Sequence, residues 1–194
     1  NTGRLYAFDI SEKRLAKLKP RMARSGLSNV HPVVIAHEKD AKIKRLAGKL
    51  DRVLVDAPCS GLGTLRRNPD VKWRQTPVGV AELNVKQASI LASAARMVKP
   101  GGRLVYATCS ILDEENEGIV QAFLAEHADY VLVPASQVLA EQKVDLEMGD
   151  YLKLYPHLHQ TDGFFAAIME RKKAPAKVAP EEMAPETDAE SEAD

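Results

Sequence analysis

Short apolar runs that alternate with helix-forming segments are the feature that most limits how this chain can fold. Extended segments are predicted at residues 4–10, 30–36, 51–58, 103–109, 130–134, 151–156 and 164–171. Helical segments are predicted between them, at residues 11–26, 40–48, 78–98 and about 113–126. Strands that alternate with helices predict an α/β fold in which a parallel sheet carries helices on both faces. The 194 residues suffice for one such domain.

The run from Asp51 to Pro58 is β-branched and almost uninterrupted by polar residues. That pattern is typical of a strand buried on both faces of a parallel sheet. Ligands of such sheets bind beyond the carboxyl ends of the strands. We therefore expect the functional residues to follow the strands directly.

Composition excludes several other classes of protein. The chain has no run of 18 apolar residues and no signal-peptide pattern, so we expect no membrane partner. Two cysteines 50 residues apart indicate reduced thiols and a cytoplasmic location. Neither cysteine belongs to a zinc-ligand spacing, so no metal is expected.

The net charge of zero hides an uneven distribution. Residues 174–194 contain one lysine and seven acids, are rich in Ala, Pro and Glu, and are predicted to be disordered. Residues 1–173 contain 26 basic and 20 acidic side chains. This excess of basic residues permits an anionic partner, although an ordinary solvated surface explains it equally well.

Two acidic residues follow the first two predicted strands. Asp9 lies where a nucleotide-binding α/β unit accepts hydrogen bonds from ribose hydroxyls, but it also lies beside a helix that begins near Ser11. Asp40 could approach an adenine ring in the same crevice, or could simply cap the next helix. Taken alone, the cap is the favoured interpretation of Asp40.

Both cysteines come directly after predicted strands. Asp56 ends the third strand and is followed by Cys59, and Cys109 follows the fourth. If these strands are neighbours, their ends lie about 5 Å apart, and both sulfurs face one crevice. A small buried apolar role for each cysteine, or a disulfide between them, are the alternatives.

The segment 62–75 is a basic loop that contains the only tryptophan of the chain, Trp73. Its basic residues could lower a thiol pKa and bind phosphates; they are Arg66, Arg67, Lys72 and Arg74. Basic residues interleaved with an aromatic residue fit a surface for single-stranded nucleic acid. The alternative is a solvated loop that Trp73 anchors in the core.

These motifs together resemble a known family. In chain order they are Asp56-Ala57-Pro58-Cys59-Ser60-Gly61; Arg66-Arg67-Asn68-Pro69-Asp70 with Trp73; Thr108-Cys109-Ser110 with Glu114-Glu115-Asn116; and Thr161-Asp162-Gly163-Phe164-Phe165. The set resembles the RNA (cytosine-C5) methyltransferases of the RsmB/Sun/Nop family. The resemblance covers about residues 1–171, and the acidic tail has no counterpart in it.

The resemblance implies a Rossmann-like sheet, S-adenosylmethionine as cofactor, and a monomer that acts on RNA. It implies that Asp9 binds the cofactor ribose, that Asp40 lies near its adenine, and that Asp56 faces both cofactor and target base. It implies that Cys109 is the nucleophile that adds to C6 of cytosine and that Cys59 assists product release. The substrate is expected to be 16S ribosomal RNA, with transfer RNA as the alternative.

One part of the family pattern is missing from the chain. The glycine-rich cofactor loop of the family lies on a strand upstream of Asp9, and Gly101-Gly102 cannot replace it. We therefore expect residues 1–173 to form a partial catalytic domain that lacks its first strand. Such a chain would bind the cofactor weakly, be inactive alone and expose a sheet edge.

Three alternatives to this function remain. DNA cytosine-C5 methyltransferases carry their nucleophile in a Pro-Cys motif, which here would make Cys59 rather than Cys109 the nucleophile. A non-catalytic RNA-binding protein could also use a methyltransferase scaffold, but it would need neither thiol. A dinucleotide-dependent oxidoreductase is disfavoured because the paired thiols have no role in it.

Overall fold

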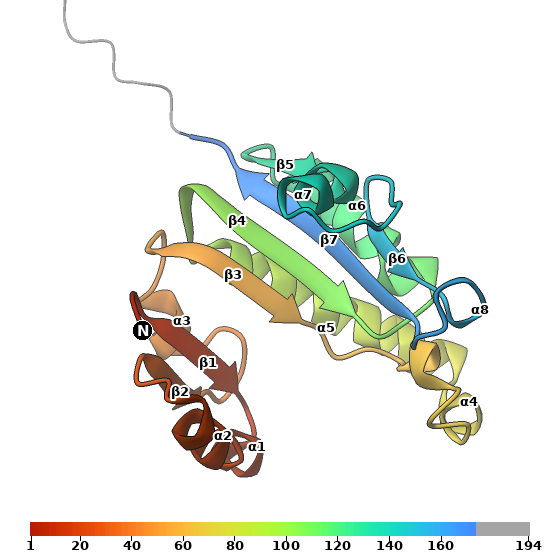
Figure 1. The fold of residues 1–194 in the computed structure, drawn as a ribbon, viewed down its shortest axis with the longest axis horizontal. Coiled ribbons are helices and arrows are strands. Elements are labelled where there is room, and N and C mark those ends of the chain that lie inside the picture. Colours follow the sequence, from red (N-terminus) through yellow and green to blue (C-terminus); the bar gives the residue numbers. More distant parts are fainter. Residues whose placement is uncertain (174–194) are drawn as a thin grey trace, which may run out of the picture.

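A five-stranded mixed sheet is the centre of the structure, a computed structural model that describes residues 1–173 (Figure 1). Its strands, in spatial order, are β3 (Leu50–Asp56), β4 (Val98–Thr108), β7 (Phe164–Arg171) and β5 (Tyr130–Val133), and β6 (Leu152–Leu154) also pairs with β7. Strands β3 and β4 are parallel, whereas β7 is antiparallel to β4, β5 and β6. The expected all-parallel sheet is therefore wrong at this edge. The predicted segment 174–194 lies outside the described residues.

Strands β1 (Leu5–Asp9) and β2 (Val30–Val34) form a separate parallel pair. Helix α3 (Ala41–Lys44) attaches this pair to the main core through the buried Ile43. The Ser89 hydroxyl also donates a hydrogen bond of 2.7 Å to the Glu38 carboxylate. In Figure 1, β1, β3 and β4 point the same way, so their carboxyl ends face one edge of the molecule.

Helices flank the sheet as the alternating pattern predicts. The remaining ones are α1 (Glu12–Ala16), α2 (Leu18–Ser25), η1 (Leu62–Thr64), α4 (Val71–Arg74), α5 (Pro77–Ala95), η2 (Asp113–Glu115), α6 (Glu117–Glu126), α7 (Ala135–Glu141) and α8 (Pro156–His159). Figure 1 shows α5 and α6 on one face of the sheet and α7 on the other. The short helices α4, α7 and α8 were not predicted. Within residues 1–173, no helix combines the length and apolarity needed to cross a membrane.

Local sequence accounts for where the helices begin and end. Helix α5 begins at Pro77, and the Thr76 side chain caps it by accepting the Gly79 N–H at 3.0 Å. It ends at Ala95, earlier than predicted, because Val98 already pairs with β3. The predicted helix 11–26 breaks at Lys17, and Pro20 is accommodated in the first turn of α2, where no intrahelical N–H is needed.

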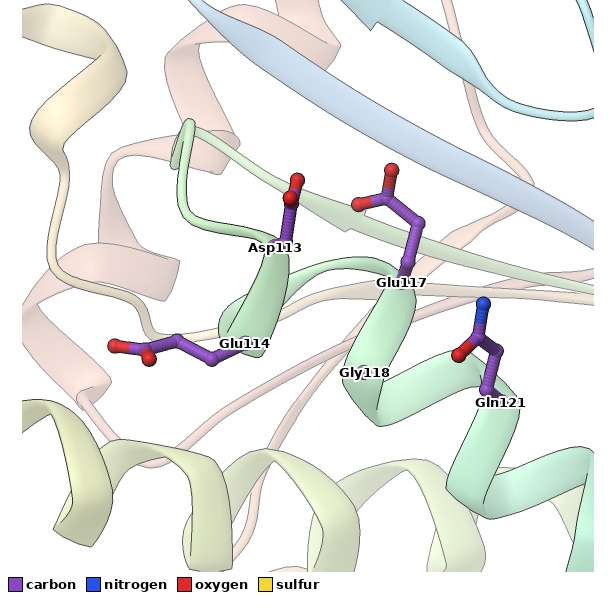
Figure 2. A pocket seen from close by; sticks show the side chains of 5 residues that line it. All are labelled: Asp113, Glu114, Glu117, Gly118 and Gln121. Carbon is purple, nitrogen blue, oxygen red and sulfur yellow. The ribbon is translucent and has the colours of Figure 1, made fainter.

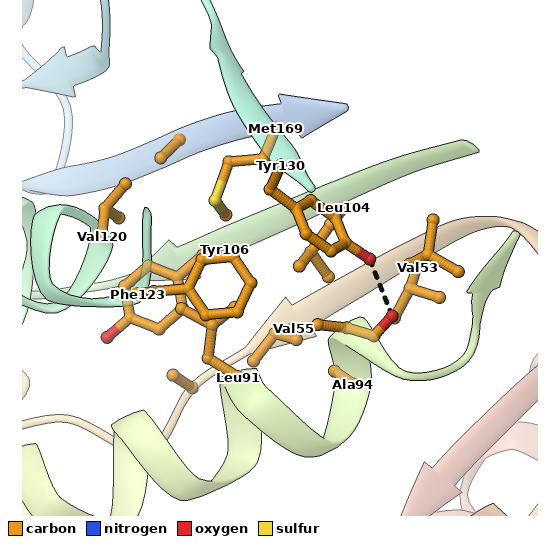
Figure 3. Close-up of a cluster of buried hydrophobic side chains, with 14 of the residues drawn as sticks. Val53, Val55, Leu91, Ala94, Leu104, Tyr106, Val120, Phe123, Tyr130 and Met169 are labelled. Atoms are coloured by element: carbon orange, nitrogen blue, oxygen red, sulfur yellow. Dashed lines mark hydrogen bonds between the residues drawn. The ribbon is translucent and has the colours of Figure 1, made fainter. Parts of the chain in front are cut away.

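The core lies between α5, α6 and the inner face of the sheet (Figure 3). Leu91, Leu104 and Met169 are fully buried there, and the Tyr130 hydroxyl donates to the Ala95 carbonyl at 2.7 Å. Leu54 is 69% exposed, so the expectation that β3 is buried on both faces is wrong. The physical reason is that α5 covers only the face of β3 that Val53 and Val55 present.

Replacement of Leu91 by alanine tests the position of this core. Leu91→Ala removes a fully buried side chain from α5, so it should lower the free energy of unfolding by about 2–5 kcal/mol. Val85→Ala on the same helix is the matched control, because Val85 is 74% exposed and should change it by about 0.5 kcal/mol or less. Urea denaturation followed by circular dichroism measures both. Equal effects of the two substitutions would show that this face of α5 is not the buried one.

Candidate active site

The two cysteines meet where β3 and β4 end. The Ala57 N–H donates to the Ala107 carbonyl at 2.9 Å, which extends the parallel pairing one residue beyond β3. Just past this point the sulfur atoms of Cys59 and Cys109 lie 3.3 Å apart, and both side chains are half-buried. The strands are thus neighbours, as the crevice hypothesis requires, and both thiols are free.

A hydrogen bond between the two thiols makes them chemically unequal. Donation by the Cys59 S–H to Cys109 lowers the pKa of Cys109 to about 7, although partial burial acts in the opposite direction. The same hydrogen bond, together with burial, raises the pKa of Cys59 far above its ordinary range. Cys109 is therefore the thiolate of the pair from neutral pH upward, and the thiolate is the nucleophilic form.

Asp56 lies at the last position of β3, with an exposed side chain. Its negative charge raises the pKa of Cys109, which places the carboxylate within electrostatic reach of the sulfur. The structure therefore brings three of the expected catalytic residues, Asp56, Cys59 and Cys109, to one place. An acid, a thiol and a thiolate beside an open surface can combine proton transfer with covalent addition.

A buried polar cluster lies behind the cysteines, and the sequence analysis assigned it no role. Its members are Ser60, Gln87, Thr108, Ser110, Glu115 and Asn116, each exposed by 3% or less. Glu115 accepts from the Ser60 N–H at 2.8 Å and the Ser60 O–H at 2.5 Å, and from the Gln87 amide at 3.1 Å. Five of the six belong to the motifs that carry the family resemblance, and those motifs were the signal for them; Gln87, on α5, lies outside the motifs.

The other half of the cluster holds the end of β4. The Thr108 hydroxyl donates to the Asn116 side-chain oxygen at 2.6 Å, and the Asn116 amide donates to the Ser110 carbonyl at 3.1 Å. The Ser60 and Ser110 hydroxyls lie 3.3 Å apart and connect the two halves. The backbone on both sides of each cysteine is thus held from within the protein.

Two glycines allow the basic loop to pack closely against this site. The Gly63 N–H donates to the Cys109 carbonyl at 2.9 Å, and the Gly163 N–H donates to the Gly63 carbonyl at 2.7 Å. A side chain at Gly63 would place its Cβ 2.7 Å from the Cys109 oxygen, so only glycine allows this approach. The Thr161-Asp162-Gly163 segment and the basic loop are therefore packed together.

Three of the four basic residues of the loop form ion pairs with nearby carboxylates. Arg67 forms an ion pair with Asp162, and Arg66 lies 3.8 Å from the same carboxylate, so both are tied to the neighbouring segment. Arg74 pairs with Asp70 at 2.6 Å on the exposed helix α4.

Trp73 is exposed on the same helix, next to Lys72. Its side chain is 80% exposed, so the alternative in which it anchors the loop in the core is wrong. The Lys72 ammonium lies 4.8 Å from the centre of the Trp73 ring, within cation–π distance. The described surface therefore presents an aromatic ring with a cation over it and Arg74 one residue further along.

The two acids expected near a cofactor are held by local hydrogen bonds. Asp9 accepts the Ser11 N–H at 2.8 Å and the Arg14 guanidinium at 2.7 Å through the same oxygen, Oδ1. Burial would raise the pKa of Asp9, but these hydrogen bonds outweigh it and the pKa is lowered. Asp40 caps α3 by accepting the Lys42 N–H at 2.9 Å, and it also accepts the Ala36 N–H at 2.9 Å. Both bonds lower the pKa of Asp40.

Two surface hollows lie away from the thiols. Figure 2 shows the first, about 430 Å³, lined by Asp113, Glu114, Glu117, Gly118 and Gln121. Its three carboxylates would repel a phosphate backbone. The second, about 610 Å³, lies between residues 147 and 159. Among residues 1–173, no three His, Cys, Asp or Glu side chains are placed to hold a metal ion together.

Comparison with known proteins covers most of the chain. Residues 1–170 match the family model described as 16S rRNA methyltransferase RsmB/F. The probable ribosomal RNA small subunit methyltransferase B of Synechocystis sp. is 38% identical over 169 residues, which are 87% of this chain and 38% of that protein. The corresponding Bacillus subtilis protein is 37% identical over 179 residues, 89% of this chain and 38% of its own length. The chain thus spans well under half the length of these relatives.

Solved structures agree with the sequence comparison. NSun6 from Pyrococcus horikoshii, solved with SFG, superposes with a TM-score of 0.74 at 30% identity, over 89% of this chain and 42% of that one. A methyltransferase homologue protein from Pyrococcus horikoshii gives 0.69 at 29% identity, over 87% and 53%. The two-strand and five-strand sheets described above therefore belong to a methyltransferase fold.

The inequality of the thiols predicts a specific pH dependence. The rate at which iodoacetamide modifies Cys109 should rise with pH through a midpoint of about 7, because only the thiolate reacts. In Cys59→Ala the hydrogen-bond donor is absent, so the midpoint should move up toward about 8.5, the ordinary value for cysteine. Peptide mass spectrometry of timed samples measures both rates. A midpoint that is the same in both proteins would contradict the shared hydrogen bond.

Proposed function

The chain belongs to the 16S rRNA methyltransferase RsmB/F family, and we propose that it carries the catalytic residues of an enzyme that methylates C5 of a cytosine in RNA. The observation that carries the proposal is the pair of sulfurs 3.3 Å apart at the ends of β3 and β4, beside Asp56. Small-subunit ribosomal RNA is the proposed substrate because that is what the names of the curated relatives specify. Because the chain spans 38% of those relatives, the activity is proposed for a longer protein that contains it.

Cys109 is the proposed nucleophile. Carbon 5 of cytosine is too weakly nucleophilic to accept a methyl group directly. Addition of the Cys109 thiolate to C6 forms an S–C6 bond and breaks the C5–C6 π bond, whose electron pair moves to C5 and is shared through C4 with N3, which makes C5 nucleophilic. A pKa of about 7 supports this role, because a large fraction of Cys109 is then thiolate at neutral pH.

Asp56 and Cys59 complete the proposed reaction. The charge that the addition places on the ring is stabilised if Asp56, in its protonated form, donates a proton or hydrogen bond to N3 of the base. After methylation, C5 must lose its proton and the S–C6 bond must break, which returns the electron pair to Cys109. Cys59 lies beside the leaving sulfur and is the proposed base for that step. Bonding of Cys109 to C6 removes the thiolate that accepts the Cys59 hydrogen bond, which is the main cause of the raised Cys59 pKa.

The residues at the end of β1 fit a nucleoside cofactor in part. S-adenosylmethionine, when bound, supplies the methyl group on a positively charged sulfur; SFG, present in the NSun6 structure, is an analogue of it. Asp9 Oδ2 remains for a ribose hydroxyl, since Ser11 and Arg14 both use Oδ1. Both oxygens of Asp40 already accept backbone N–H groups, from Lys42 in α3 and from Ala36, so its proposed contact with the adenine would be through packing. The chain spans 38% of its curated relatives, which supports the proposal that residues 1–173 are a partial catalytic domain.

The exposed α4 helix is the proposed RNA surface. Trp73 offers a stacking face and Lys72 and Arg74 offer charge for phosphates. Arg66 and Arg67 lie in the same loop and are held in place through Asp162, so we propose that they contact the backbone near the target base. The target base must leave its stack, which costs least in a loop or single strand.

Two alternatives differ in what they predict for the thiols. If Cys59 were the nucleophile, as in the Pro-Cys motif of DNA enzymes, the roles of the two residues would be exchanged. The lowered pKa belongs to Cys109, which favours the first assignment. A non-catalytic RNA-binding protein would need neither the close thiols nor the buried cluster that holds them.

Covalent trapping distinguishes these possibilities. In the full-length protein with substrate RNA and S-adenosylmethionine, Cys59→Ala should accumulate a covalent RNA adduct on denaturing gels, because release is impaired. Cys109→Ala should form no adduct and should transfer no labelled methyl group. The reverse pattern would assign the nucleophile to Cys59. RNA protection without methyl transfer by the unaltered protein would support the non-catalytic alternative.

The role of Trp73 is tested by binding rather than by turnover. Trp73→Ala should weaken RNA binding by about 5- to 100-fold, the range expected for loss of one stacked base. Leu158→Ala, an exposed apolar residue on α8, is the control and should leave the Kd unchanged. Fluorescence anisotropy with a labelled single-stranded RNA measures the Kd. Equal Kd values for the two variants would show that Trp73 on α4 is not part of the RNA-binding surface.

A further inference from the structure

We propose that Glu115, together with Gln87, is a positioning residue that holds the turn carrying Cys59 so that the two sulfurs stay within hydrogen-bonding distance. Neither side chain can touch a bound base, because both are fully buried behind the cysteines. The positioning role rests on the proposed function in one respect only, the assignment of Cys109 as the reactive thiol.

Burial of the Glu115 carboxyl group costs folding free energy. Its side chain is 0% exposed, and no Lys, Arg or His among residues 1–173 forms an ion pair with it. Its hydrogen bonds come from Ser60 and Gln87, which are neutral. A buried carboxyl group without a cationic partner is worse for stability than an apolar residue of the same size. Stability alone therefore does not account for a glutamate here.

The hydrogen bonds act on the two peptide groups that flank Cys59. On one side, the Gln87 amide donates to the Pro58 carbonyl at 2.9 Å and to Glu115 at 3.1 Å. On the other side, the Ser60 N–H donates to Glu115 at 2.8 Å. One carboxylate and one amide thus hold the backbone both before and after the cysteine. The Cys59 side chain has little freedom to move away from Cys109.

The same residue is also connected to the strand that leads to Cys109. The Tyr106 hydroxyl, from β4, donates to the backbone carbonyl of Glu115 at 2.7 Å. The Ser60 hydroxyl contacts the Ser110 hydroxyl at 3.3 Å. Glu115 therefore lies between the two backbone segments whose separation sets the sulfur–sulfur distance.

The charges around the thiols allow positioning to be separated from a direct electrostatic effect. The groups that face the pair are the Asp56 and Glu115 carboxylates, which raise the pKa of Cys109, and the Tyr106 phenol, whose own pKa is raised by burial and by Cys59 and Glu115. Removing the charge of Glu115 without moving Cys59 would thus lower the pKa of Cys109. Displacing Cys59 would raise it, because the Cys59 hydrogen bond is the largest influence on Cys109. The two effects have opposite signs.

The test is the pH dependence of Cys109 alkylation in Glu115→Leu. Leucine offers no acceptor for the Ser60 N–H, the Ser60 O–H or the Gln87 amide, so the turn should shift and the midpoint should rise from about 7 toward about 8.5. At pH 7 the alkylation rate should then fall by about 15-fold, in proportion to the thiolate fraction. Glu114→Leu is the matched control, since Glu114 is the exposed neighbour and its replacement should leave the midpoint unchanged.

Thermal melting of each variant shows whether it is folded. If Glu115→Leu does not fold, Gln87→Leu decides, since it removes the donor to Pro58 without altering charge and with little change in volume. A raised midpoint in a folded variant supports the positioning role. An unchanged or lowered midpoint in a folded variant overturns it. The readout uses iodoacetamide alone, so it stays informative even if the protein proves not to methylate RNA.

Discussion

The parallel pairing of β3 with β4 is the constraint on which the rest of the site depends. Parallel neighbours end at the same edge of a sheet, and here the backbone pairing continues to Ala57 and Ala107 before the two segments diverge. Each segment then carries a cysteine shortly after the end of its strand, and the two sulfur atoms lie 3.3 Å apart. At that distance one thiol can donate to the other, so two identical groups acquire different acidities. Their proposed division into nucleophile and helper follows from this difference.

The interior of the molecule has an apolar part and a polar part. The core around Leu91 and Tyr106 is apolar and sets the stability of the α5–sheet packing. The interior behind the cysteines is polar, although Gln87 and Leu91 lie one turn apart on the same helix. Polar groups there cost stability unless they are hydrogen-bonded, and nearly all of them are. They hold the flanking peptides of each cysteine, which an apolar filling could not do.

Much of the fold could be predicted from the chain, because apolar period and Gly/Pro positions report local structure directly. β1 and β3 were predicted within about two residues, and the alternation with helices indicated the α/β class. Strand β7 was predicted with its bounds, but its antiparallel direction was not, since an apolar run carries no information about direction. The exposure of Leu54 was missed for a similar reason: whether a second layer covers a strand is a tertiary property.

The candidate site, like the fold, could be predicted from the sequence only in part. Cys59 and Cys109 were identifiable because thiols after strands are rare and chemically informative. Gln87 was not, since an amide within a helix resembles a solvated residue until its burial is known. Glu115 belongs to a recognised motif, but its role could not be inferred before its burial was known. Asp9 and Asp40 were recognised by position, but only the structure shows that one binds Arg14 and the other caps α3.

Mapping a trapped adduct tests the central claim, the unequal roles of the two thiols, most directly. In substrate RNA that carries 5-fluorocytosine, fluorine cannot leave C5 as a proton does, so the intermediate should stay bonded to the enzyme after methyl transfer. We expect mass spectrometry of the digested full-length protein to find the methylated nucleotide on the peptide that contains Cys109. Attachment to Cys59, or methylation without any covalent product, would contradict the account.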